Sequence, residues 1–167
     1  FIDGRPEAYP ASFFQETYLP MQLDENKFAL VDKQYNFKTI FFSHTDQTPW
    51  AEAFLKQILQ NNKWQMVYLD DFSVIFTKDK NTRLAAKRVK PIIKTDYSNI
   101  KSLIQLAHFF QNTSFTDQEI KILQKIISID SKSCPALYNL TLKLQSKNDP
   151  SFPIFLNPAD LSQKKLM

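Results

Sequence analysis

The stretch that decides the fold of the first half of the chain is Phe1–Tyr9, FIDGRPEAY. Its first two residues are apolar and suit the end of a buried strand, and Gly4 then predicts a tight turn, because glycine accepts a positive φ. Open α/β sheets hold ligands at the carboxyl ends of their strands, so Asp3, Arg5 and Tyr9 form a candidate ligand site. The alternative is a buried ion pair of Asp3 with Arg5 that only fixes the turn, and the sequence favours this structural interpretation.

The length and composition of the chain limit the kinds of fold and functional site that it can form. Its 167 residues are enough for one domain or two small ones, and 43% of them are hydrophobic. The single glycine excludes a glycine-rich phosphate loop, and the single cysteine excludes an internal disulfide and a cysteine zinc site. The net charge of +4 is not clustered into a nucleic-acid-binding stripe. The chain lacks an initiator methionine and begins as a core strand, so we expect it to be a piece of a longer protein.

Residues 1–80 predict a small α/β sandwich with a mixed sheet, parallel at first and closed by an antiparallel hairpin. Thr39–Phe42 is a continuous apolar run, which is typical of a strand buried on both faces. Thr48 and Pro49 are typical of a helix start. The expected elements are, in order, a strand at residues 1–2, helices at 11–22 and 27–35, a strand at 39–42, a helix from 49, and a hairpin of strands 64–69 and 72–76.

Acidic residues lie at the tip of the predicted hairpin. Asp70 and Asp71 separate two runs rich in aromatic and β-branched residues. If the hairpin turn lies at the same sheet edge as Asp3, Asp70 is a further candidate ligand-binding residue. A hard cation bound by Asp70 and Asp71, or by His44 and nearby Asp46, is the metal alternative; ordinary turn chemistry explains these residues more simply.

Residues 81–95 predict a basic connector between two domains. Lysine and arginine crowd the stretch from Lys78 to Lys94, with Pro91 near its end. A solvated linker is the simpler interpretation, because no aromatic residues that could stack on bases are interleaved. Contact with anionic lipid headgroups or a phosphate is the functional alternative.

Residues 96–167 predict a tetratricopeptide-like helical domain. The apolar pattern of Leu103, Leu106 and Phe110 recurs 34 residues later, and 34 is the period of this helix–turn–helix repeat. Thr116 and Glu119 match a capping box at a helix start, although Glu119 stands where the repeat usually places a small residue. The expected helices are at 98–112, 116–129 and 135–146, with a weaker fourth at 152–167.

The first five residues, FIDGR, followed by Tyr9, resemble the segment after the last membrane helix of bacterial multi-spanning glycosyltransferases that use polyprenyl-phosphate sugars (type C). Tyr35–Phe41, and Trp64–Asp71 leading into Val74–Phe76, suit the same soluble tail, and terminal tetratricopeptide-like helices also occur in such proteins. In that family the catalytic acids lie early in the chain, near the membrane helices, and no residue here matches them. The resemblance therefore implies an accessory domain on the extracytoplasmic face of the membrane.

Two classes of function follow. The first is a non-catalytic accessory domain of a membrane-embedded glycosyltransferase-like protein, with a protein partner on the helical region, the membrane reached through upstream helices, and a sugar or lipid-linked sugar bound only by the full-length protein. The second is a freestanding small-molecule-binding or catalytic α/β domain that uses Asp3, Arg5 and Asp70. For this chain we expect no catalytic residue, metal, cofactor or nucleic acid. Apolar runs of about 20 residues upstream of Phe1 would favour the first class.

Overall fold

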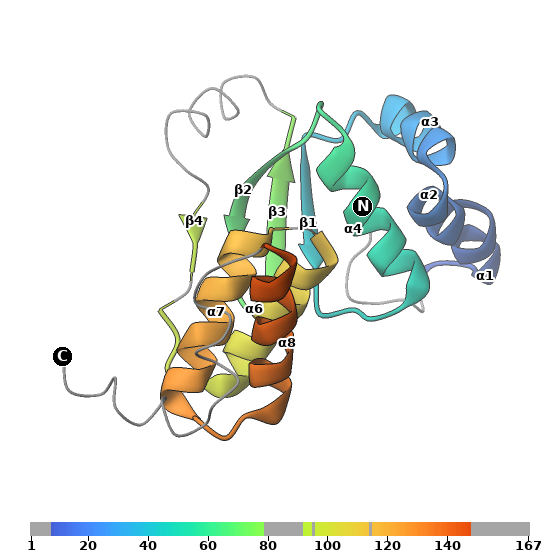
Figure 1. The fold of residues 1–167 in the computed structure, drawn as a ribbon. Coiled ribbons are helices and arrows are strands. Elements are labelled where there is room, and N and C mark those ends of the chain that lie inside the picture. The colour runs from blue at the N-terminus through green and yellow to red at the C-terminus, as the bar shows by residue number, and fades with distance from the viewer. Residues whose placement is uncertain (1–7, 79–91, 95, 114, 148–167) are drawn as a thin grey trace. The chain divides into compact units, whose positions relative to one another are not determined.

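The computed structural model describes residues 8–78, 92–94, 96–113 and 115–147 (Figure 1). Helices and a small sheet make it a mixed α/β protein, which confirms the predicted class at this level. The chain forms two compact units, an α/β unit that ends at Ile93 and a helical unit that begins at Lys94 and takes in the turn Asp70–Phe72. The strand predicted at residues 1–2, most of the basic connector and the helix at 152–167 lie outside the described residues.

The first helix of the α/β unit is continuous but changes its winding. It consists of α1 (Ala11–Phe13), a π-helical segment η2 (Phe14–Tyr18) and α2 (Leu19–Leu23). At the junction of η2 and α2 the Leu19 N–H donates to the Phe14 carbonyl, five residues back. The helix predicted at 11–22 is confirmed, and Pro20 lies in the first turn of α2, where its missing N–H is tolerated.

The second helix, α3 (Glu25–Tyr35), confirms the helix predicted at 27–35 and is capped at both ends. The Asp24 carboxylate accepts the N–H of Asn26 at 2.8 Å and that of Lys27 at 3.4 Å. Asn36 ends the helix with a left-handed φ of 50°, a conformation that asparagine tolerates better than most residues. The Asp24 cap fixes where α3 turns back from α2.

The sheet has the strand order β1-β3-β2-β4. Its strands are β1 (Thr39–Ser43), β2 (Gln65–Leu69), β3 (Ser73–Thr77) and β4 (Ile92–Ile93). The predicted hairpin is confirmed as the antiparallel pair of β2 with β3. The expectation that the sheet begins parallel is wrong for the described strands, because β1 pairs antiparallel with β3 and only β4 is parallel to its neighbour, β2. The strand β4 also shows that the stretch predicted as a connector contributes to the sheet.

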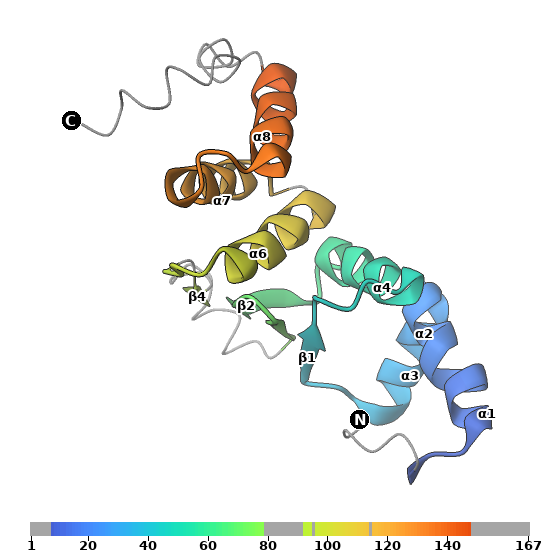
Figure 2. The ribbon, with the colours of Figure 1, turned by 90° about the horizontal axis from the view of Figure 1, so that it is seen from below.

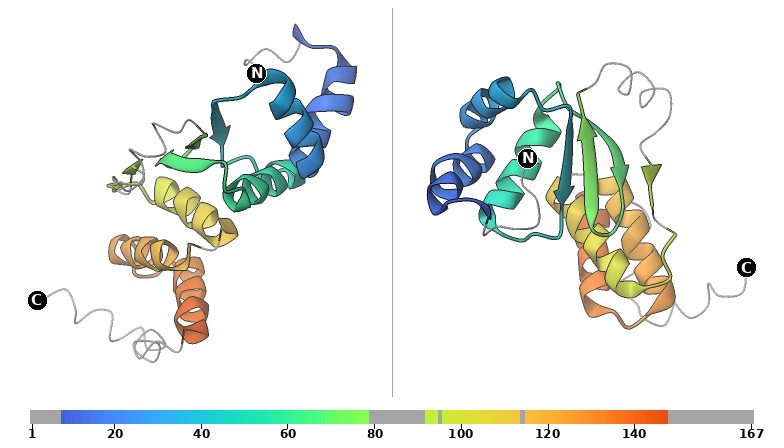
Figure 3. Two further views of the ribbon diagram at one scale, coloured as in Figure 1. Left: turned by 90° about the horizontal axis from the view of Figure 1, so that it is seen from above. Right: turned by 180° about the vertical axis from the view of Figure 1, so that it is seen from behind.

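Burial on both faces, predicted for β1, is wrong. Phe41 is 70% exposed, and Ile40 and Phe42 are half-buried. Among the described strands β1 has a neighbour on one side only, and one helix, α4 (Pro49–Gln60), packs near it through Phe54. Figures 2 and 3 show α4 along one face of the sheet, with α2 beside it. The central strand β3, by contrast, buries Val74 fully.

The helical unit consists of α6 (Ile100–Thr113), α7 (Thr116–Ile129) and α8 (Cys134–Ser146). Helix α7 packs on both of the others. The predicted capping box is wrong, because Phe115 is the N-cap and Glu119 is buried, with its Oε2 2.9 Å from Lys143 Nζ of α8. The least exposed apolar side chains of the unit are Leu103, Leu106, Phe109, Phe110, Ile122, Leu123, Ile126, Leu140 and Leu144.

Candidate functional site

The residues predicted to bind a ligand do not form one described site. Asp3 and Arg5 lie outside the described residues, so neither their ion pair nor their role is tested. Tyr9 belongs to the α/β unit, whereas Asp70 groups with the helical unit. The Asp70 carboxylate accepts the N–H of Phe72 at 2.9 Å, the local bond expected of an aspartate in a turn. This bond supports the structural interpretation of Asp70.

Tyr9 packs into a row of rings along the first helix. Its ring stacks on Phe13 at 5.2 Å between centroids and meets Phe14 edge-on at 6.2 Å. Phe14 in turn meets Tyr18 edge-on at 5.8 Å. Aromatic pairs at these distances stabilise packing by about 0.5–1.5 kcal/mol each. Tyr9 therefore has a packing role, and through this row it supports the position of Tyr18.

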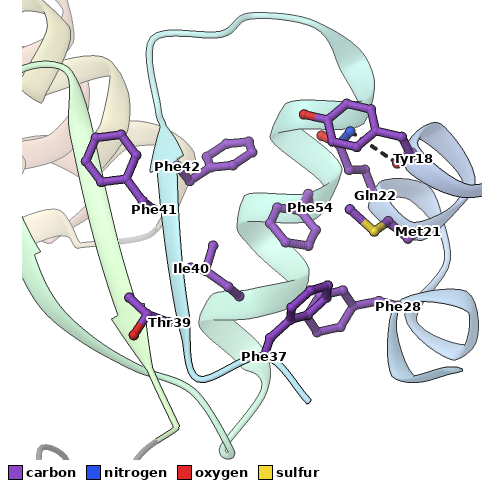
Figure 4. A pocket seen from close by; sticks show the side chains of 10 residues that line it. All are labelled: Tyr18, Met21, Gln22, Phe28, Phe37, Thr39, Ile40, Phe41, Phe42 and Phe54. Carbon is purple, nitrogen blue, oxygen red and sulfur yellow. Dashed lines mark hydrogen bonds between the residues drawn. The ribbon is translucent and has the colours of Figure 1, made fainter. Parts of the chain in front are cut away.

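An apolar groove of about 390 Å³ lies between β1 and the first helices (Figure 4). Phe42 and Phe28 each lie 5.3 Å from Phe54 of α4 between ring centroids, so Phe54 joins the two sides. In Figure 4, Ile40 and Phe42 point from β1 toward α4, and Met21 points in from the helices opposite. The lining residues are Tyr18, Met21, Gln22, Phe28, Phe37, Thr39, Ile40, Phe41, Phe42 and Phe54.

The helical side of the groove also carries polar atoms. Gln22 is only 2% exposed, and its Nε2 donates to the Tyr18 carbonyl at 3.3 Å. Burial raises the pKa of the Tyr18 phenol, and the nearby Asp46 carboxylate raises it further. Among the described lining residues Tyr18 is the one titratable group, and a phenol with a raised pKa stays protonated at neutral pH. The groove thus offers neutral hydrogen-bonding groups and aromatic surface, a poor set for acid–base chemistry.

A second, more polar hollow runs along α3, from Glu25 to Asn36. Two of its charged side chains, Asp32 and Lys78, pair with each other. Lys78 Nζ lies 2.5 Å from Asp32 Oδ1 and 5.4 Å from the centroid of the Trp64 ring. Asp32 Oδ1 also accepts the Phe37 N–H at 3.1 Å. A lysine held by a carboxylate and an aromatic face closes the packing between α3, β2 and β3. We therefore assign this hollow a structural role.

The described part of the chain shows no metal-binding cluster. No three histidine, cysteine, aspartate or glutamate side chains gather there in a way that could hold a metal ion. Cys134 is an exposed free thiol at the start of α8. Within the described residues no helix has the length and apolarity needed to cross a bilayer.

The sequence contains a signal for the groove that its apolar pattern hides. Six of the lining residues are aromatic, and four of these, Phe28, Phe37, Phe41 and Phe42, fall within fifteen positions of one another. A dense aromatic stretch reads equally well as ordinary core, which is why it was not predicted as a site. Comparison of the chain with protein-family models, curated proteins and solved structures gives no match.

Proposed function

We propose that this chain is a non-catalytic accessory domain that binds another protein. The observation that carries this proposal is the groove beside β1, where half-buried aromatic side chains line the outer side of a strand that has no second neighbouring strand among the described residues. Burial of apolar area contributes about 25 cal/mol per Å², so a partner that covers Ile40, Phe42 and their neighbours gains a substantial part of its binding energy there. An enzyme site would need charged or nucleophilic groups, and the described lining residues are aromatic, aliphatic or neutral polar.

The resemblance to type-C glycosyltransferase tails supports the cellular setting of the proposal. In that setting the domain lies on the extracytoplasmic face, linked to membrane helices upstream, and holds a partner or acceptor beside the membrane enzyme. The alternative of a freestanding catalytic domain receives no support from Tyr9, which packs on Phe13, or from Asp70, which bonds within its own turn.

The helical unit supplies a second protein-facing surface in this proposal. Its helices α6 and α8 begin at Ile100 and Cys134, which are 34 residues apart, and this spacing supports a tetratricopeptide-like arrangement. Stacked repeats of this kind expose a concave face for peptides. Tyr138 and Leu142, one turn apart on α8, are 66% and 45% exposed and suit such a face.

Site-specific photo-crosslinking in the cells that make the protein tests the proposal. A photoreactive phenylalanine analogue placed at Phe42, whose ring points into the groove, should cross-link to a distinct protein, identified by mass spectrometry. The matched control is the same analogue at Phe72, which is 55% exposed in the β2–β3 turn. Equal labelling from both positions, labelling by lipid or small molecules alone, or turnover of a sugar ester by the purified chain would refute the proposal.

A further inference from the structure

Among the described residues, the backbone of β1 pairs with another strand on one side only, that of β3. The Lys38 carbonyl accepts the Lys78 N–H at 3.2 Å, and this bond fixes the phase of the ladder between β1 and β3. In an antiparallel pair, successive residues turn their N–H and C=O groups alternately toward and away from the partner strand. Ile40 therefore turns its groups toward β3, whereas Thr39 and Phe41 turn theirs to the outer edge.

The outer edge of β1 borders the groove. Thr39 and Phe41 are among its lining residues, so the outward N–H and C=O groups meet the same space as the aromatic side chains. At the end of the strand, the Asp46 N–H lies 3.4 Å from the Ser43 carbonyl and closes the edge. An occupant that satisfies these groups is an extended chain, because only a strand matches their spacing of two residues.

The groove is bounded by helices opposite β1, and this arrangement favours a single strand over a second sheet as its occupant. Tyr18, Met21 and Phe28 bound it opposite β1 (Figure 4). If a second copy of the chain paired its own β1 with this edge, the β3 of that copy would have to occupy the positions of α2 and α3. A single extended segment, by contrast, lies between β1 and the helices and rests on Phe54.

The two ends of the groove differ in charge. Asp46 follows β1 at the Ser43 end, where its charge raises the pKa of Tyr18. Lys38 precedes β1 at the other end and is exposed. A segment that runs antiparallel to β1 therefore meets complementary charges if it begins with a cationic residue and ends with an anionic one. Antiparallel pairing is also the more stable form of strand addition.

From this geometry we infer that the groove binds one extended segment of a partner protein as an added strand on β1, antiparallel to it, with apolar side chains at alternate positions and a cationic residue opposite Asp46. This inference deepens the proposed function and rests on it, since it names the binding mode and the chemistry of the partner segment. The affinity comes from the main-chain bonds to Thr39 and Phe41, and the selectivity from the aromatic lining.

The inference is tested by measuring the fluorescence anisotropy of a labelled peptide, Lys-Val-Thr-Val-Thr-Val-Glu, as the whole chain is added to it. The variant Phe41→Pro removes an outward N–H without removing a bond to β3, and proline is tolerated at such an edge position. We expect Phe41→Pro to weaken binding at least about tenfold, the effect of losing a main-chain bond from a desolvated site. Phe41→Thr keeps the N–H and should weaken binding by less than about threefold.

Peptides N-methylated at alternate amides are the second arm. Methylation of the amides that face β1 should abolish binding, and methylation of the other phase should not. Equal effects of the two phases, or equal losses in Phe41→Pro and Phe41→Thr, would overturn strand addition. If the peptide bound only after residues 1–7 were deleted, the inference of a partner protein would be wrong, because the chain's own residues 1–7 would then compete for the groove. Cross-linking from Phe42 without peptide binding would leave the proposed function standing and refute this mode alone.

Discussion

The two units of the molecule treat their apolar side chains differently. In the helical unit, Leu103, Leu106 and Phe110 are fully buried, and α7 is covered on both sides by its neighbours. In the α/β unit, Ile40 and Phe42 remain half-buried beside a groove. A helix satisfies its own backbone, so its unit needs only side-chain packing to be complete, whereas an edge strand also needs a backbone partner. The outer edge of β1 is therefore where binding through backbone hydrogen bonds is expected, whereas the surface proposed on α8 offers side chains alone.

The largest effect that separates the two units is expected for Phe110→Ala. The ring is 0% exposed and meets Phe109 and Phe115 edge-on at 5.5 and 6.3 Å. Its loss should lower the free energy of unfolding by about 3–5 kcal/mol, through lost transfer energy and a cavity. Urea unfolding followed by circular dichroism measures this change.

The matched control is Phe41→Ala in β1, where the side chain is 70% exposed. We expect a change within about 0.5 kcal/mol, as for most surface substitutions. Both tryptophans, Trp50 and Trp64, lie in the α/β unit, so their fluorescence reports that unit separately. Comparable losses from the two substitutions would contradict the distinction between a complete and an incomplete core.

The second effect concerns the ion pair between α7 and α8. Glu119 is 2% exposed, and Lys143 is partly exposed, at 27% of its side chain. Lys143→Met leaves a buried carboxylate without its cation, which costs 3–5 kcal/mol in fully buried pairs; solvent reaches this pair, so we expect about 1–3 kcal/mol. Urea unfolding followed by circular dichroism measures the loss. The double variant Glu119→Leu with Lys143→Met should recover most of it, and failure to recover would show that the lysine acts through packing.

The sequence predicts the helical unit better than the groove, for a physical reason. The bounds of α7 coincide with the predicted helix at 116–129, because its helical apolar period is a local signal. The exposure of Phe41 depends on which strands pair with β1, and pairing between distant segments leaves no local trace in an apolar run. The role of Glu119 was missed for the same reason, since its partner Lys143 lies on another helix.

The helix predicted at 11–22 already includes Met21 and Gln22, but the sequence does not show that these side chains line a groove. The helix continues through Pro20, and the π-helical segment before it rearranges the backbone bonds. The interpretation of Asp70 as a turn residue needed no tertiary information, and the structure supports it.

A smaller effect is expected at the cap of α3, which holds Phe28 against the groove. Asp24→Ala removes the acceptor for the N–H groups of Asn26 and Lys27 and should cost about 1 kcal/mol. Tryptophan fluorescence measures it, because the Trp64 ring lies 6.2 Å from that of Phe28. Asp24→Asn keeps an acceptor and should stay close to wild type. If both variants lose the same stability, the charge at the helix start matters more than the bond.

The last effect, a pH dependence of stability that begins only near pH 10, is expected at Tyr97 of the helical unit. Burial, together with Asp71, raises the pKa of its phenol from 10.0 to about 12, and the Asp71 N–H lies 3.4 Å from its hydroxyl. Because the folded state holds the proton more tightly than the unfolded chain, this contribution to stability is complete below pH 10 and is lost as the pH rises from 10 toward 12. Tyr97→Phe has no proton to lose, so the stability of wild type should decline toward that of the variant over this range.

Ultraviolet absorbance of tyrosinate should show one fewer late-titrating group in the variant. Parallel pH profiles of the two proteins would mean that the turn Asp70–Phe72 does not shield Tyr97 as the structure describes.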